Sequence, residues 1–263
     1  MRVVGKPLNR LVFLAALLSA GCALPGRRAA PPPPSPDAAH RIVRETAGLL
    51  QRFQATCTIS FDAGLVRGTL AGRYRLRPPD ALAATFRGPF GMKAGRLVVE
   101  GGRYEVDTGR GGVVRGRLDS LDLERITGIP FPVDDLMLLF APIAYIPEDA
   151  RTVDFAVQGE DSLWFWELAT PGGGMDLLLD PRRPVSLRQR WFGENGAMIL
   201  EKHFAGFSRS SGLYIPHEMR LMVPGRTPFE VVVRLDDYRV NPRWVENPFR
   251  FKLDGKVGGG RPG

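Results

Sequence analysis

FQATCTISFDAGLVRGTLAGRYRL, residues 53–76, is the stretch that decides the fold. Every second residue of its first half, from Phe53 to Phe61, is apolar, and polar residues fill the positions between them. This alternation predicts a strand with one apolar and one polar face. A turn near 62–64 follows, and apolar residues then recur on alternate positions as far as Leu76. The stretch therefore predicts a β-hairpin that buries one face.

The two-residue period recurs through most of the chain that follows. Gly, Pro and Asp separate the further strand candidates, which are 82–86, 96–100, 103–107, 153–157, 162–169, 175–179, 185–192, 198–207, 214–222 and 229–238. A meander of this length without a large central helix is typical of an antiparallel sheet.

Helical spacing of apolar residues is confined to three places. Ser35, Pro36 and Asp37 form a helix-start signal, and the spacing after them predicts one amphipathic helix over 37–52. Two short helices are expected at 118–126 and 133–140, because Gly128, Pro130 and Pro132 separate two runs of helical spacing. The chain is thus expected to form one α+β domain over 37–253, in which helices pack against a curved antiparallel sheet, with a disordered tail over 254–263.

The first 21 residues have the three parts of an export signal: cations, an apolar run over 11–18 and small residues. The run is too short to span a bilayer. The sequence Leu18-Ser19-Ala20-Gly21-Cys22 is similar to the lipobox of bacterial lipoproteins, with Ser19 where Leu is usual. This resemblance implies a signal peptide over 1–21 and palmitate-type acylation of Cys22. The alternative is an ordinary secretory signal in which Cys22 is incidental.

Residues 22–36 are expected to be a tether, because the stretch is small, basic and then proline-rich and cannot form a packed element. Extended, it could hold the domain up to about 40 Å from the bilayer. Position two of the mature chain would be Ala23, whereas Asp at that position accompanies inner-membrane retention in lipoproteins of enteric-type bacteria. The resemblance therefore favours a lipid-anchored protein on the periplasmic face of the outer membrane.

Charge narrows the possible partners. Removing residues 1–21 takes away three cations and no anions, which lowers the formal net charge from +8 to +5. A positive face could attract anionic head groups, or the charge could serve only solubility. Because Arg and Lys are scattered and no aromatic platform lies among them, nucleic acid is not expected as a partner.

The sequence has no recognisable catalytic constellation. His40, His203 and His217 lie on unrelated elements without metal-ligand spacing, and no Gly-x-Ser-x-Gly elbow is present. We expect no enzymatic activity, no cofactor and no metal, with His40 solvated on the first helix. Since Cys22 would carry lipid, Cys57 is expected to be a buried free thiol.

Two motifs add a family resemblance. Gly88-Pro89-Phe90-Gly91 ends the third strand candidate, and the run from Thr127 to Leu136, TGIPFPVDDL, opens the second middle helix. In order and separation they resemble LolB, the outer-membrane lipoprotein receptor of the LolA/LolB superfamily. The resemblance is clearest over 53–142. It departs in the second strand, where LolB has a Trp pattern and this chain has Arg73-Tyr74-Arg75-Leu76, so the same cargo and handover partner are not implied.

The resemblance implies an unclosed, strongly curved antiparallel sheet, a half-barrel of about 11 strands covered by a few helices, around an apolar cavity for acyl chains. In LolB an apolar residue after the third strand protrudes and contacts the membrane. This implies that role for Phe90, assisted by Met92; the alternative is that Phe90 tucks into the sheet edge. The implied partners are acyl chains of membrane lipids or lipoproteins and a periplasmic LolA-like carrier.

The residues expected to line the cavity share an apolar position on the predicted strands and middle helices. They are Phe53, Ile59, Phe61, Leu70, Tyr74, Leu82, Phe86, Leu97, Val99, Leu136, Leu139, Phe140, Trp164, Trp166 and Leu200. Each could equally be core, because every strand must bury one face.

The expected function is binding of acyl chains or lipidated proteins and their localisation to the outer membrane. The alternative is an assembly lipoprotein that docks another envelope protein and has no ligand cavity. Oligomeric state cannot be read from the sequence.

Overall fold

The computed structural model describes residues 35–108, 112–118, 137, 140–159, 162–225 and 228–251. Contacts divide the chain into residues 1–31 and 32–263, and the fold lies in the second unit. Several sequence-based expectations fall outside the described residues: the signal peptide, acylated Cys22, nearly all of the tether and of the two middle helices, and the tail.

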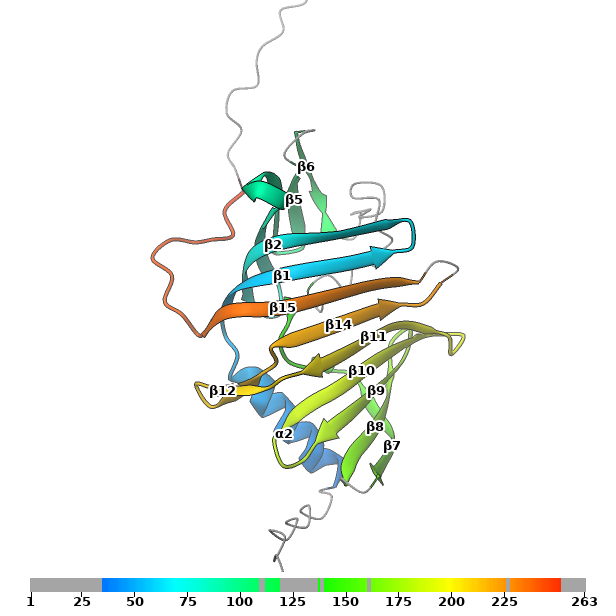
Figure 1. Ribbon diagram of the computed structural model, residues 1–263. Coiled ribbons are helices and arrows are strands. Elements are labelled where there is room, and N and C mark those ends of the chain that lie inside the picture. The colour runs from blue at the N-terminus through cyan, green and yellow to red at the C-terminus, as the bar shows by residue number, and fades with distance from the viewer. Residues whose placement is uncertain are drawn as a thin grey trace, which may run out of the picture. The chain divides into compact units, whose positions relative to one another are not determined.

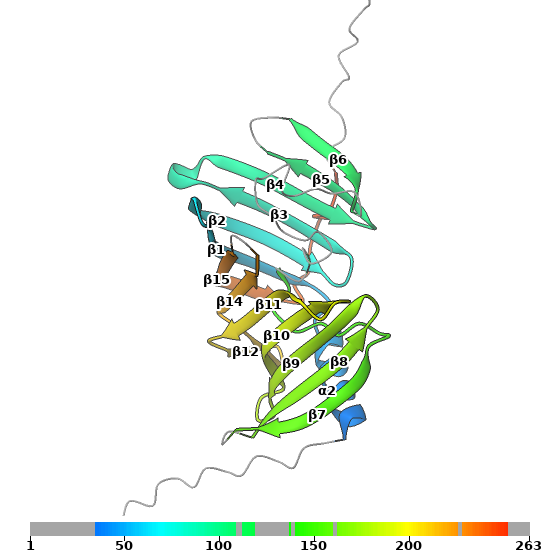
Figure 2. The same ribbon diagram turned by 90° about the vertical axis from the view of Figure 1, so that its right-hand side faces the viewer.

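Within the described residues, thirteen strands form one antiparallel sheet, in the order β6-β5-β4-β3-β2-β1-β15-β14-β11-β10-β9-β8-β7 (Figures 1 and 2). Their bounds are β1 Phe53–Ala63, β2 Val66–Arg77, β3 Ala81–Arg87, β4 Lys93–Glu100, β5 Arg103–Asp107, β6 Val113–Arg117, β7 Arg151–Gln158, β8 Leu163–Thr170, β9 Gly173–Asp180, β10 Val185–Gly193, β11 Met198–Ala205, β14 Glu218–Val223 and β15 Phe229–Val240. A separate two-stranded hairpin contains β12 Ser208–Ser210 and β13 Leu213–Ile215.

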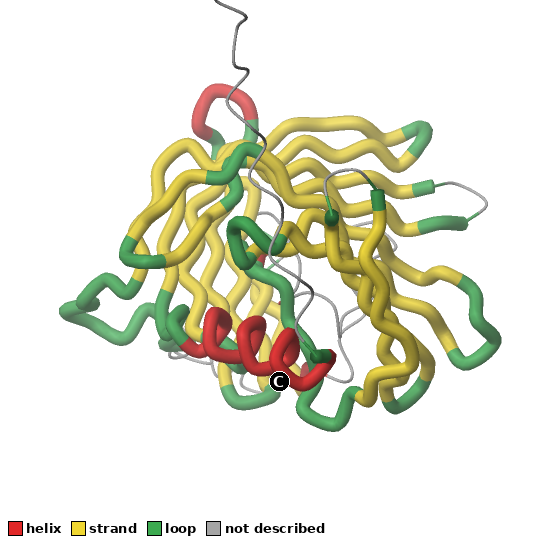
Figure 3. The backbone as a smooth tube through the Cα atoms, turned by 90° about the horizontal axis from the view of Figure 1, so that it is seen from below, coloured by secondary structure: helices red, strands yellow, loops and turns green. Residues whose placement is uncertain are grey.

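The sheet is unclosed among the described residues, because β6 and β7 stand at its two ends and do not pair with each other. Viewed from below, the strands follow a curve, and α2 lies on its inner side (Figure 3). The predicted open, curved antiparallel sheet is therefore confirmed in outline. The count of about 11 strands was too low.

The sheet has one strand more than the twelve strand candidates, and one candidate is divided between the sheet and the separate hairpin. The candidate at 214–222 divides into β13 and β14, because Pro216 has no N–H to donate to a ladder and the chain turns at Pro216 and His217. The edge strand Val113–Arg117 was not predicted. Three of its five residues are Arg115, Gly116 and Arg117, which gives no apolar alternation, and Arg115 forms an ion pair with Glu105 at 2.9 Å.

Strand β1 has one buried face, as its alternating sequence predicts. Phe53, Ala55, Cys57 and Ile59 are buried, and the residues between them are partly exposed. Antiparallel partners on β2 and β15 continue the same apolar face, with Tyr74 opposite Ala55 and Val233 opposite Ile59. We call this face the inner face. Burying it against covering segments, not strand propensity, is what stabilises so long a meander.

One α-helix is described, α2, over Pro36–Gly48. The hydroxyl of Ser35 accepts a hydrogen bond from the Ala38 N–H at 3.3 Å, which confirms the predicted start. The predicted end at residue 52 was wrong. Asn241 accepts hydrogen bonds from the N–H groups of Gln51 and Arg52 and donates one to the Leu49 carbonyl, which holds residues 49–52 in a turn.

The C-terminal segment covers part of the opposite, outer face of the sheet. Phe249 is buried against Ala81 and Val98, and Trp244 packs beside it. Arg96 donates to the Arg250 carbonyl at 2.8 Å. This apolar patch explains why Val98, an outward residue of β4, is fully buried.

Asn241 offers a test of how the helix is joined to the sheet. It lies at φ 51°, where Ala is strained and Gly is not. We expect Asn241→Ala to lower the free energy of unfolding by about 2 kcal/mol, and Asn241→Gly by about 1 kcal/mol, because both lose the hydrogen bonds and only Ala adds strain. Urea unfolding followed by tryptophan fluorescence measures both values, and equal losses would contradict the strain component.

Candidate functional site

The inner face holds two apolar clusters rather than one. The larger cluster lies over β1–β5, β11, β14 and β15, and the smaller lies over β8 and β9. Of the predicted lining residues, the following are buried in the larger cluster: Phe53, Ile59, Tyr74, Leu82, Leu97, Val99, Phe140 and Leu200. Trp164 and Trp166 belong to the smaller one.

The remaining predicted lining residues differ in placement. Phe61 and Phe86 are partly buried and pack against the larger cluster. Leu70 lies opposite Ile59 on β2 but is only partly buried. Leu136 and Leu139 lie outside the described residues.

Helix α2 covers the smaller cluster. Ala39, on its inward side, is completely buried with Trp166 and Leu177, and Ile42 and Val43 pack at the margin. His40 does not point into solvent as expected. Its ring meets Trp166 edge-on with 5.4 Å between centroids, and burial lowers its pKa. The helix therefore contributes more of its surface to the core than its apolar spacing predicts.

The segment 140–150 continues this cover across the inner face. Phe140 is buried, and its ring centroid lies 4.9 Å from that of Tyr74 and 6.2 Å from that of Phe86. Ala144, Ile146 and Ala150 are buried in the smaller cluster. One segment thus packs on both halves of the curved sheet.

Polar side chains hold this segment by its backbone carbonyl groups. Lys202 Nζ donates to the Ala141 carbonyl at 2.7 Å, and Gln189 Nε2 donates to the Tyr145 carbonyl at 2.6 Å. Both side chains extend from the inner face. From α2, Arg44 Nη2 donates to the Glu148 carbonyl at 2.8 Å. Three hydrogen bonds, together with apolar contacts, fix the cover to the sheet and the helix.

Lys202 stands between Leu200 and Phe204 on alternate positions of β11, at an inward site that normally holds an apolar residue. Its side chain is 1 % exposed, and Nζ lies 4.8 Å from the centroid of the Phe204 ring. Burial lowers the pKa of Lys202 to about 7. The alternation could have located this residue, but nothing in the sequence reveals its carbonyl partner.

Two further polar groups lie on the same face. The Tyr74 hydroxyl is buried and has no hydrogen-bond partner among the described residues, and its pKa is raised, chiefly by burial. Cys57 is a buried free thiol, as expected, and burial raises its pKa to about 12. Neither group is therefore ionised at neutral pH, so the inner face around them carries no negative charge.

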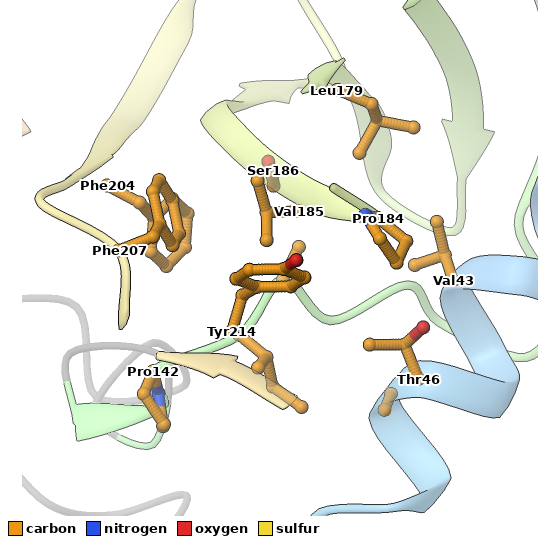
Figure 4. A pocket seen from close by; sticks show the side chains of 13 residues that line it. Val43, Thr46, Pro142, Leu179, Pro184, Val185, Ser186, Phe204, Phe207 and Tyr214 are labelled. Atoms are coloured by element: carbon orange, nitrogen blue, oxygen red, sulfur yellow. The ribbon is translucent and has the colours of Figure 1, made fainter. Parts of the chain in front are cut away.

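A small cavity lies where α2 meets the turns at one end of the sheet. Its volume is about 30 Å³, roughly the space of one water molecule. Figure 4 shows Val43 and Thr46 of α2 facing the β9–β10 turn and Tyr214 across it. The lining residues are mostly apolar: Val43, Thr46, Ala47, Pro142, Ile143, Ala144, Leu179, Pro184, Val185, Ser186, Phe204, Phe207 and Tyr214.

None of the residues predicted to line a cavity is among these thirteen. The sequence could not indicate this cavity, because it is formed by a helix, a covering segment and two turns that are far apart along the chain. The predicted lining over β1–β4 stays a prediction. The space over those strands is occupied in part by Phe140, with Tyr74 and Phe86 around it.

The turn between β3 and β4 projects from the opposite end of the strands. Pro89–Gly91 form one turn of 3-10 helix, seen in Figure 3 as the red segment across from α2. Phe90 has a relative exposure of 102 %, and Met92 is 56 % exposed. Phe90 is thus not tucked into the sheet edge. It also holds φ at 59°, a conformation that costs a non-glycine residue about 1 kcal/mol.

The described residues offer no catalytic grouping that we recognise. His40, His203 and His217 lie on α2, on β11 and before β14, and His203 contacts Glu201 on the outer face at 2.9 Å. Within the described ranges, no three His, Cys, Asp or Glu side chains are placed to hold a metal ion. No helix among them is long and apolar enough to cross a membrane.

Comparison by sequence finds no match: no protein-family model fits the chain, and no curated protein is similar to it at a significant level. Comparison by structure does. An outer membrane lipoprotein-sorting protein domain from Vibrio parahaemolyticus superposes with a TM-score of 0.60 at 14% identity, covering 80% of this chain and 97% of that one.

A LolA superfamily protein from Nitrosomonas europaea gives a TM-score of 0.54 at 10% identity, with 78% of this chain and 94% of the other covered. The chain has a LolA/LolB-like fold. A DUF1329 family protein from Desulfovibrio piger also shares it, with a TM-score of 0.57 at 13% identity over 81% and 96% of the two chains. At these identities the likeness establishes the architecture and leaves the ligand to be argued from this chain's own residues.

The buried Lys202 predicts a distinctive dependence of stability on pH. An unfolded lysine titrates near 10.4, and the folded one at about 7. Between these values the unfolded chain binds a proton that the folded chain does not, so stability rises with pH. Relative to Lys202→Met, we expect the unfolding free energy of the native protein to rise by about 1 kcal/mol per pH unit from pH 7 to 9.

Below about pH 6 both states carry the proton, so the difference between the two proteins should stay constant there. Urea titrations at several pH values measure it. A difference that does not change between pH 6 and 9 would show that Lys202 is protonated in the fold throughout.

Proposed function

We propose that this protein binds acyl chains of lipids or lipoproteins between its curved sheet and the cover formed by α2 and residues 140–150, and helps to localise them to the outer membrane. The observation that carries the proposal is an apolar inner face on an unclosed sheet, covered by a segment that a few side-chain hydrogen bonds retain. The fold shared with a lipoprotein-sorting domain supports it.

Binding would require the cover to move. A space of about 30 Å³ cannot hold an acyl chain, whereas about 12 buried methylenes would gain about 10 kcal/mol. The hydrogen bonds from Lys202, Gln189 and Arg44 contribute about 1 kcal/mol each in net terms. Because the chain would also replace the apolar contacts of the displaced segment, opening is energetically accessible.

Release needs no external energy source. Moving an acyl chain from the inner face to a bilayer exchanges one apolar surrounding for another, so the requirement is a contact that keeps the chain out of water. The exposed side chains of Phe90 and Met92 would supply that contact with the membrane. The strained φ of Phe90 is consistent with a position kept for function rather than for folding.

Anchoring completes the proposal. Acylation of Cys22, with a tether over 22–36, would keep the domain within about 40 Å of a membrane. Ala23 after the acylated residue supports an outer-membrane location, on the periplasmic face. A LolA-like carrier would then be one source of cargo, and the bilayer its destination.

Filling the cavity tests acyl binding. Ala47 lines the cavity from α2, and Ala38 is a partly buried alanine on the same helix that does not line it. We expect Ala47→Leu to weaken binding of a fluorescent long-chain fatty acid about tenfold, because the larger side chain would block the space beneath α2 through which the acyl chain would enter. Ala38→Leu should change it less than twofold.

Thermal unfolding of both variants controls for loss of fold. Equal affinities of the two variants, with native melting temperatures, would exclude this end of the sheet as the entry to the ligand site.

Membrane contact is tested separately. We expect Phe90→Glu in the residue 32–263 unit to leave the melting temperature unchanged, because Phe90 makes no buried contact. Its partition onto phosphatidylcholine–phosphatidylglycerol liposomes should fall about tenfold, since a charge replaces a side chain that would be buried. Co-sedimentation measures the partition, and unchanged partition would remove Phe90 from the mechanism.

A second function has one observation in its favour. Strand β7 ends the sheet, and Val153 and Val157 are exposed on it, which suits addition of a partner's strand. The protein would then dock another envelope protein. Native mass spectrometry of membrane-extracted protein separates the two: bound lipid supports acyl binding, and a stoichiometric protein supports docking.

A further inference from the structure

We infer that the β1–β2 turn, through Leu65 and Val66, is a second point of contact with a lipid bilayer, so that the domain docks on the membrane by two neighbouring hairpin tips. The inference rests on the proposed membrane contact of Phe90 and extends it to a turn that the resemblance to LolB did not indicate.

Leu65 is as exposed as an amino acid can be in a folded chain. Its relative exposure is 102 %, equal to that of Phe90, and Val66 beside it is 55 % exposed. Among the described large apolar residues only Val245 is equally exposed. The turn is nevertheless well defined: the Asp62 carboxylate accepts a hydrogen bond from the Gly64 N–H at 3.0 Å, and Gly64 takes φ 71°. The structure therefore presents Leu65 outward on a fixed turn.

Strand direction places both tips at one end of the sheet. Ala63 pairs with Val66 to close the first hairpin, and Arg87 pairs with Lys93 next to the second turn. Because β2 and β3 are antiparallel neighbours, both turns extend in the same direction from this ladder; Arg87 pairs with Ala71, so the β1–β2 hairpin reaches five residues further than β3. Figure 2 shows the β1–β2 and β3–β4 turns along the same edge, at its left.

The form of this surface fits a bilayer better than a protein partner. A protein interface has a contiguous, well-packed apolar centre. Here the apolar side chains stand on separate turns, with Gly68, Thr69 and charged residues on the strands behind them. A fluid bilayer, unlike a protein surface, can surround each protruding side chain independently.

Cations lie directly behind both tips. Arg67 follows Val66, is 74 % exposed and pairs with Asp62 at 2.9 Å. Arg87 precedes the Phe90 turn and is exposed, and Lys93 follows it and pairs with Asp107 at 2.6 Å. Glu230 lies opposite Asp62 on β15 and pairs with Arg220 at 3.1 Å, so these charges amount to four cations and three acids. They leave a net positive charge at the depth of the head groups when the tips are inserted. The surface thus suits an anionic bilayer.

The proposed tether is compatible with this orientation. Strand β2, at 12 residues, spans about 40 Å from one end of the sheet to the other. Residues 22–35 reach about as far when extended. An anchor in the same membrane would therefore allow the tips to reach its surface.

Tryptophan placed at the tips tests the inference in the acylated full-length protein. Leu65→Trp, Phe90→Trp and, as a matched control, Val245→Trp would be reconstituted with phosphatidylcholine–phosphatidylglycerol vesicles containing brominated lipid. Val245 is equally exposed but follows the end of β15, at the other end of the strands. We expect bromine to quench the added fluorescence at 65 and 90 and to leave that at 245 unchanged.

Each other outcome has a definite meaning. Quenching at 90 without quenching at 65 would overturn the second contact and leave the proposed function standing. Quenching at all three positions would show adsorption without orientation and would also overturn it. Quenching at neither 65 nor 90 would remove membrane docking altogether, whereas acyl binding would still be judged by the Ala47 and Ala38 variants.

A charge substitution provides a second measurement. We expect Leu65→Glu to slow transfer of a fluorescent fatty acid from the protein to these vesicles about tenfold, and Val245→Glu to change it less than twofold. Phosphatidylcholine vesicles alone should show slower transfer for the native protein. Equal rates for the two Glu variants would contradict the inference.

Discussion

The pairing of β1 with β15 is the interaction on which the rest of the structure depends. It joins the first and last strands of the domain in an antiparallel ladder running from Phe53 opposite Val240 to Asp62 opposite Glu230, with one register shift at Thr56 and Cys57. Without it, β1–β6 and the strands β7–β11 with β14 and β15 would be two separate meanders, each with a long unpaired edge. With it, the free edges move to β6 and β7, and the strands form one curved sheet (Figure 3). Its two apolar clusters lie on the covered inner face. Residues 140–150, which precede β7, pack on both apolar clusters and supply the cover together with α2.

The contacts that hold residues 140–150 on the sheet differ from those inside an ordinary apolar core. A core segment is retained almost wholly by apolar contact, but here a lysine, a glutamine and an arginine bind backbone carbonyls at Ala141, Tyr145 and Glu148. Burying a lysine is unfavourable, as its lowered pKa shows, so its inward position on β11 reduces stability relative to an aliphatic residue. These hydrogen bonds can be exchanged for water if the segment lifts, whereas the buried contacts of Phe140, Ala144 and Ile146 would have to be replaced by apolar contacts with a ligand. A polar fixation of this kind favours a cover that can open.

The sequence could predict the features that depend on residues close together in the chain, and it could not predict those that depend on contacts between distant residues. The alternation from Phe53 to Ile59, the cap at Ser35 and the buried thiol of Cys57 were predictable, because each depends on residues close in sequence. The end of α2 was not, since it depends on Asn241, about 190 positions away. The cavity was missed for the same reason. The sequence assigned the lining to strand residues by their period, but period only shows which face is buried, and the volume left beneath a cover depends on how α2, Pro142 and Tyr214 meet in space. Phe90 was singled out through a motif, while Leu65 has the same exposure without one.

The two ends of the strands therefore differ in the side chains that they expose and bury. The distance between them limits how ligand entry and membrane contact could be connected. At one end α2, the turn before β10 and Tyr214 of the β12–β13 hairpin bring mostly apolar side chains together round the small cavity. At the other, two turns expose single apolar residues with cations behind them. The inner face connects these ends over the length of a strand, roughly the length of a long acyl chain. Tyr74 and Cys57 on it are not ionised at neutral pH, and Lys202, with a pKa of about 7, is partly neutral there. A chain that enters beneath α2 would lie along the strands, with Phe140 as the largest side chain in its way. Movement of the segment that carries Phe140 would then couple loading at one end to membrane contact at the other.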